Sequence, residues 1–159
     1  MTQTTTTQAD PIIVQVPGSL APNVFALRLN TLAAWVFVLG ALLVWLVRAN
    51  VRPFAADALA AYAALSLSAL AGLHIGLAMR SRVVSSRPYV WAVACMLLAW
   101  VGLVMPSRSG LIVLGVMLAG TYLVDRRHYG EFDATPWLMA RFRLSAVACF
   151  ACMLGAAGV

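Results

Sequence analysis

The sequence predicts an all-α membrane protein, a polytopic bundle of five transmembrane helices. Hydrophobic residues make up 63% of its 159 residues and charged residues only 10%, whereas a soluble domain averages about 25% charged. Five uncharged apolar stretches follow one another along the chain, and most are near the ~20 residues that cross a ~30 Å hydrocarbon core. In lipid such stretches must be helices, because an open strand leaves its backbone polar groups unpaired.

The chain is expected to begin with a polar tail over residues 1–23. Threonines dominate its first part and show no packing pattern, which is typical of a disordered or interfacial segment. No basic region precedes a short apolar run, so the tail does not match a cleavable signal peptide. We therefore assign residues 24–159 to a single five-helix transmembrane domain.

The first three spans are expected at residues 29–47, 58–79 and 88–107. Each is free of charged residues and has charged residues at both ends. Such uncharged stretches are long enough to cross the bilayer as helices.

The last two spans, at 109–124 and 137–158, are less regular. The fourth contains only 16 uncharged residues, so it requires local thinning of the bilayer or snorkelling side chains. The fifth carries Arg141 and Arg143 within its first two turns. Arginines at that depth must snorkel, pair or bind an anionic group.

The arginines predict the orientation of the bundle. Five spans place the two termini on opposite sides of the membrane. The side of the N-terminal tail holds eight of the eleven arginines and the other side holds three. Because positive residues accumulate on the cytoplasmic side, we expect a bacterial inner-membrane protein with a cytoplasmic N-terminus and a periplasmic C-terminus.

The second span carries a row of small residues at every fourth position, ending in Ser68, Gly72 and Gly76. Such spacing lets two helix backbones approach closely. We expect Gly72 and Gly76 to pack on another helix of the same bundle, with homodimerisation through this face as the alternative. His74 lies two residues from each glycine, about 180° away around the helix, and so should face a different neighbour.

A histidine inside a span usually faces the bundle interior, because a polar side chain in lipid is costly. Four roles remain open for His74. They are an interhelical hydrogen bond, proton transfer or ligand contact, a haem or metal ligand, and contact with lipid near the interface.

Charged residues gather at the cytoplasmic ends of the last two spans, where two consecutive antiparallel helices meet. They are Asp125, Arg126, Arg127, Arg141 and Arg143. One interpretation is an Asp–Arg pair that holds the helices together, with the other arginines at lipid headgroups. The alternative is a pocket for an anionic or quinone-like ligand, lined by His74, Asp125 and Arg141.

Other kinds of chemistry have weak support. Cys149 and Cys152 match C-x-x-C, but they lie deep in a span, where a reactive thiolate is disfavoured. Soft-metal binding by Cys95-Met96 together with Cys152-Met153 has similarly weak support. No phosphate-binding glycine loop, nucleophile elbow or metalloprotease motif occurs. We therefore expect no enzyme activity, no cofactor and no catalytic or metal-binding residues. The scattered arginines form no basic stripe with aromatic residues, which argues against nucleic-acid binding.

Three motifs together resemble the transmembrane protein 69-like family of small five-span proteins. They are Gly72-Leu-His74-Ile-Gly76-Leu-Ala78, then Tyr122-Leu-Val-Asp125-Arg126-Arg127, then Pro136-Trp137 followed by Arg141-Phe-Arg143-Leu144. The resemblance covers roughly residues 25–157, although Ile75 stands where the family is expected to have an aromatic residue. It implies a domain of unknown function in bacterial inner membranes, with animal relatives associated with mitochondria.

Three functions are consistent with these observations. The first is a non-catalytic accessory or assembly factor of a membrane complex, with a respiratory complex as the example that the resemblance implies. The second is a small-solute or proton pathway through His74 and the Asp125–Arg141 cluster. The third is a redox or cofactor-binding module. The expected partners are the lipid bilayer and a membrane-protein complex.

Overall fold

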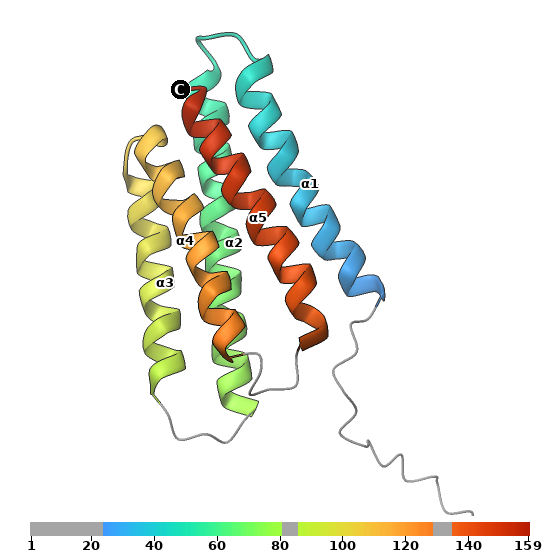
Figure 1. Cartoon of the computed structure of the whole chain (residues 1–159). Helices are drawn as coiled ribbons and strands as arrows, with labels where there is room; N and C mark the ends of the chain where they lie inside the picture. Colours follow the sequence, from blue (N-terminus) through green and yellow to red (C-terminus); the bar gives the residue numbers. More distant parts are fainter. Residues whose placement is uncertain (1–23, 81–85, 129–134) are drawn as a thin grey trace, which may run out of the picture.

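The computed structural model describes residues 24–80, 86–128 and 135–159, which form five α-helices (Figure 1). In chain order they are α1 (Val24–Leu46), α2 (Arg52–Arg80), α3 (Arg87–Val104), α4 (Ser107–His128) and α5 (Thr135–Ala157). All five are long and apolar enough to cross a membrane. The predicted all-α fold with five spans is confirmed, and the chain is a multi-pass membrane protein. The predicted tail at 1–23 lies outside the described residues.

Each predicted span corresponds to one helix, although the third, at 88–107, runs past the end of α3 at Val104 to the first residue of α4. Several helices also extend past the charged residues that bounded the prediction. α2 begins at Arg52 rather than after Asp57, and α4 continues through Asp125 to His128. A helix can carry charged residues at its ends where it enters the membrane interface. As a result α4 has 22 residues, and the shortest helix is α3 with 18.

The connection between α3 and α4 consists of Met105 and Pro106 alone. Met105 is extended, with ψ 158°, because the residue before a proline is disfavoured in the helical region. The Pro106 carbonyl then accepts a hydrogen bond from the Gly110 amide at 2.9 Å and so starts α4. A methyl group at Gly110 would lie 2.2 Å from the Gly102 carbonyl oxygen. This hairpin therefore needs a glycine at position 110.

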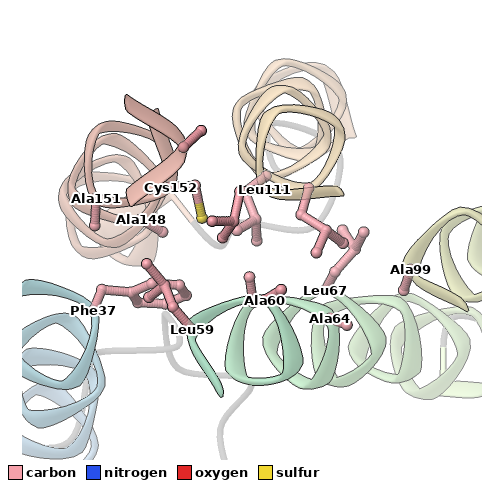
Figure 2. Packing of buried hydrophobic residues seen from close by; sticks show 14 of the residues in the cluster. Phe37, Leu59, Ala60, Ala64, Leu67, Ala99, Leu111, Ala148, Ala151 and Cys152 are labelled. Atoms are coloured by element: carbon pink, nitrogen blue, oxygen red, sulfur yellow. The ribbon is translucent and has the colours of Figure 1, made fainter. Parts of the chain in front are cut away.

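The five helices form two layers, and α2 lies in the middle of the layer of three helices. Figure 2 shows α4 and α5 on one side of the core and α1, α2 and α3 on the other. Among the described helices, α2 is the one that contacts all four others. Buried side chains from every helix fill the space between the layers, including Phe37 from α1, Leu67 from α2, Ala99 from α3, Leu111 from α4 and Cys152 from α5.

Small residues allow the close approach that membrane helices need, since lipid supplies no hydrophobic force between them. Alanines line the buried face of α2, among them Ala56, Ala60 and Ala63. Leu59 projects from the same helix toward Gly40 of α1 and Gly155 of α5. Methyl groups at those glycines would lie 2.9 and 2.7 Å from the Leu59 methyl carbons. The two glycines therefore provide the space that Leu59 occupies.

The predicted packing of Gly72 and Gly76 on a helix of the same chain is wrong. Both residues are exposed, and no described atom lies within 4 Å of a methyl group placed at either. The reason is the helical repeat: a four-residue step turns about 400°, so a row with this spacing drifts around the helix. Gly76 consequently lies about 200° from the buried Ala56, whereas Ser68, between them, is half-buried.

Candidate functional site

Three ionisable side chains from different helices meet inside the bundle. Asp125 of α4 is fully buried, and His74 of α2 and Arg141 of α5 are 8% and 6% exposed. We call these residues the polar cluster. Such residues are costly in a membrane unless they pair, and here they pair with one another.

The fold brings them together at one end of the bundle, where α2 and α4 end and α5 begins (Figure 1). Asp125 lies three residues before the end of α4, and Arg141 lies six residues after the start of α5. His74 is 18 residues from Ala56, about five full turns, so it continues the buried alanine face of α2. The core face of the central helix thus ends in an imidazole aimed at α4.

Arg141 binds one oxygen of the Asp125 carboxylate through two nitrogens. Its Nε donates a hydrogen bond to Asp125 Oδ2 at 3.1 Å, and its Nη2 donates to the same oxygen. Hydrogen bonds between charged groups are stronger than neutral ones. This ion pair links the end of α4 to the start of α5.

His74 contacts the other oxygen of the Asp125 carboxylate. Its Nε2 lies 2.7 Å from Asp125 Oδ1. Its Nδ1 lies 2.9 Å from the carbonyl oxygen of Leu70, one turn earlier in α2. Asp125 is therefore the centre of the cluster, with one oxygen for each basic partner and contacts to two other helices.

The structure brings together three of the six residues predicted for a polar site. Arg126 and Arg143 are exposed, so they point away from the polar cluster. Arg127 lies in α4, but its side chain is outside the described part of the structure. Ser68, Gly72 and Gly76 do not face the cluster, because they lie on other faces of α2.

Polar residues that the sequence analysis did not single out also join helices. Asn30 Nδ2 of α1 donates a hydrogen bond to the Ala140 carbonyl of α5 at 3.0 Å, and Trp45 Nε1 donates to the Leu154 carbonyl at 3.1 Å. Tyr62 Oη of α2 donates to the Ala33 carbonyl of α1 at 3.3 Å. Asn30 could have been found from sequence, since a polar side chain within a span seeks a partner.

The cysteines form no joint site in the described residues. Cys95, Cys149 and Cys152 are free, and no group of three or more potential metal ligands occurs in the described parts of the chain. Cys152 is buried against α4, where a methyl group at Gly115 would lie 3.0 Å from its Cβ. These observations favour a packing role for Cys152.

A groove of about 410 Å³ lies between α1 and α2, away from the polar cluster. Its lining is apolar and includes Leu39, Leu43, Leu59 and Tyr62. The polar cluster itself consists of charges that contact one another. Chemically, it can hold three helices together and can hold a proton between the imidazole and the carboxylate.

Comparison with known families identifies a match over most of the chain. A family model described as "Protein of unknown function (DUF3429)" matches residues 23–157, a range that contains all five helices in full. The chain belongs to the DUF3429 family. The DUF3429 region contains every member of the polar cluster. No curated protein and no solved structure matches the chain.

Proposed function

We propose that the protein is a non-catalytic accessory or assembly factor of a membrane complex, with a respiratory complex as the first candidate. The observation that carries this proposal is the closure of the polar cluster. The two carboxylate oxygens of Asp125 are used by His74 and Arg141, so these side chains serve to connect α2, α4 and α5. A small bundle whose buried charges connect its own helices suits a structural role.

The respiratory assignment and the cellular location rest on the resemblance and on charge. The three motifs resemble the transmembrane protein 69-like family, whose bacterial members are inner-membrane proteins and whose animal relatives are associated with mitochondria. Eight of eleven arginines lie on the N-terminal side of the membrane. We therefore place this protein in a bacterial inner membrane with its N-terminus in the cytoplasm.

Affinity purification from native membranes in mild detergent tests the accessory role. The expected result is a stable partner that belongs to a membrane complex, together with loss of that complex when the gene is deleted. The proposal fails if the protein purifies alone and its deletion leaves every membrane complex intact.

Two glycine variants test whether a partner binds at the exposed face of α2. Methyl groups at Gly76 of α2 and Gly120 of α4 would meet no described atom within 4 Å, so a side chain can begin at either position without a clash, and folding of Gly76→Leu and Gly120→Leu is checked by circular dichroism. Gly76 is exposed on the central helix, and Gly120 is half-buried. If a partner helix approaches α2, Gly76→Leu removes the partner from the purified sample and Gly120→Leu retains it.

A second candidate is a proton or small-solute pathway through His74 and the Asp125–Arg141 pair. The specific observation in its favour is the 2.7 Å contact between His74 Nε2 and Asp125 Oδ1, because such a pair can exchange a proton. In liposomes His74→Ala should abolish flux, and His128→Ala should leave it unchanged. Absence of flux with the parent protein would rule out this candidate.

A further inference from the structure

A neutral imidazole at His74 cannot satisfy both of the contacts that its two ring nitrogens make. The Leu70 carbonyl oxygen only accepts hydrogen bonds, so the 2.9 Å contact requires a hydrogen on Nδ1. A neutral ring carries one hydrogen on its two nitrogens. With that hydrogen on Nδ1, Nε2 would present a lone pair.

The same lone pair would face the carboxylate. Nε2 lies 2.7 Å from Asp125 Oδ1, and an ionised carboxylate oxygen also only accepts. Both atoms are buried, and neither makes a hydrogen bond of regular geometry to any described residue, so their contact is the close approach of an ion pair. Two lone pairs at this distance repel each other, so the contact requires that either the imidazole or the carboxylate carries a proton.

The surroundings decide where that proton belongs. The other carboxylate oxygen accepts hydrogen bonds from two nitrogens of Arg141, which favours an ionised Asp125. Among the residues that the structure describes, the charged groups that act on His74 are Asp125 on α4 and Arg141 on α5. On α3, the thiol of Cys95 interacts electrostatically with Asp125. Asp125 is thus the negative group that can balance an imidazolium at this site.

We propose that the polar cluster is a binding site for a single proton, held on the imidazole of His74 between the Leu70 carbonyl and the Asp125 carboxylate. Since Arg141 and Asp125 cancel, the occupied cluster carries one net positive charge. Loss of the proton leaves a neutral ring that satisfies only one of its two contacts. The contact to the charged Asp125 is then retained as the stronger one, and the contact to Leu70 opens.

This proposal is independent of the accessory role, since a structural protein and a pathway could both hold the proton. Nitrogen NMR of the full chain in lipid nanodiscs, labelled with ¹⁵N-histidine, tests it directly. His74 and His128 are the chain's two histidines, so a His128→Gln background leaves the His74 signals alone. Both ring nitrogens of His74 are expected to be protonated at pH 7. A neutral tautomer at pH 7 overturns the proposal, whatever the purification experiment shows.

A variant and a second spectrum locate the proton. Asp125→Asn in the same background should give a singly protonated ring at pH 7, and a ring that stays doubly protonated overturns the role of Asp125. If this variant does not fold, the parent protein still decides the question by infrared spectroscopy. An ionised carboxylate in the cluster is expected there, and a protonated Asp125 at pH 7 overturns the placement of the proton on His74.

Discussion

At the scale of single residues, the Asp125 carboxylate is the group that both basic residues of the polar cluster contact. It contacts a basic side chain through each of its oxygens, and it is fully buried. Buried ion pairs are not always more stable than apolar residues of the same volume, but removal of one partner leaves an unbalanced charge. The members of the cluster therefore depend on one another more strongly than exposed charges of the same type do.

Arg141 and Arg143 offer a matched test of this dependence, because they lie two residues apart on α5. Arg141→Gln should lower the free energy of unfolding by about 3–5 kcal/mol, since Asp125 loses its guanidinium partner. Arg143 is exposed, so Arg143→Gln should change it by less than about 0.5 kcal/mol. Denaturant unfolding in detergent, followed by circular dichroism, measures both. Equal effects of the two substitutions would show that Arg141 contributes no more than a surface charge.

Sequence reasoning could identify the members of the cluster because ionisable residues inside spans must find partners. It could name His74, Asp125 and Arg141 as the lining of one pocket, but it could not show that Arg126 and Arg143 point outward. Neighbouring residues on a helix point in different directions, and the direction that faces inward depends on how the helices pack. The proton on His74 depends on contacts at both ring nitrogens, one of which is to a backbone carbonyl that no sequence pattern marks.

At the scale of helices, the closest contacts between helices occur at glycines that do not belong to the row of small residues in α2. Gly110 faces the backbone of α3 within the short hairpin, and Gly40 and Gly155 accept Leu59. The row ending in Gly72 and Gly76 was misleading because its four-residue period does not match the 3.6-residue helical repeat. The helices themselves could be predicted, since their lengths follow from the thickness of the bilayer.

Alanine substitutions should distinguish the two kinds of glycine. Gly110→Ala places a methyl group 2.2 Å from the Gly102 carbonyl oxygen, so the backbone must shift and unfolding should become easier by about 1–3 kcal/mol. Gly72→Ala meets nothing within 4 Å and should stabilise the helix by about 0.4–1 kcal/mol, because the unfolded chain loses freedom. Unfolding of both variants in the same detergent measures the difference. The hairpin geometry would be contradicted if Gly110→Ala were neutral.

The attachment of α1 to α5 should depend on Asn30. Asn30→Ala removes the hydrogen bond to the Ala140 carbonyl, and such interhelical bonds contribute about 0.6 kcal/mol on average and at most about 1.7 kcal/mol. Thr31 is a suitable control, because its hydroxyl donates to the Leu27 carbonyl of its own helix. Thr31→Ala should therefore change the unfolding free energy by less than about 0.5 kcal/mol. A loss at Thr31 as large as that at Asn30 would argue against a specific role for the interhelical bond.

At the scale of the whole molecule, α2 is the centre of a two-layered bundle and contacts all four other helices. Neither the layers nor the helix order could be predicted, because apolar spans resemble one another and their packing depends on side-chain shape. The odd number of spans does place the two ends of the bundle's chain on opposite faces, as Figure 1 shows for the start of α1 and the end of α5.

This arrangement gives a prediction about orientation. Since arginines accumulate on the N-terminal side, a reporter fused after Val159 should be active when it functions in the periplasm and inactive when it requires the cytoplasm. Fusions in the connection at residues 129–134 should give the opposite pattern and serve as the control. A cytoplasmic signal at Val159 would reverse the proposed topology.

The origin of the polar cluster in three separate helices has a consequence for biogenesis. Since α2 and α4 precede α5 along the chain, His74 and Asp125 leave the ribosome before Arg141 during synthesis. Until the last helix arrives, the carboxylate lacks the guanidinium that occupies its second oxygen. A truncated chain therefore leaves one oxygen of a buried carboxylate without a partner from α5 within the bilayer. We expect membrane quality-control proteases to degrade chains that lack α5, because the polar groups of the cluster are then incompletely paired.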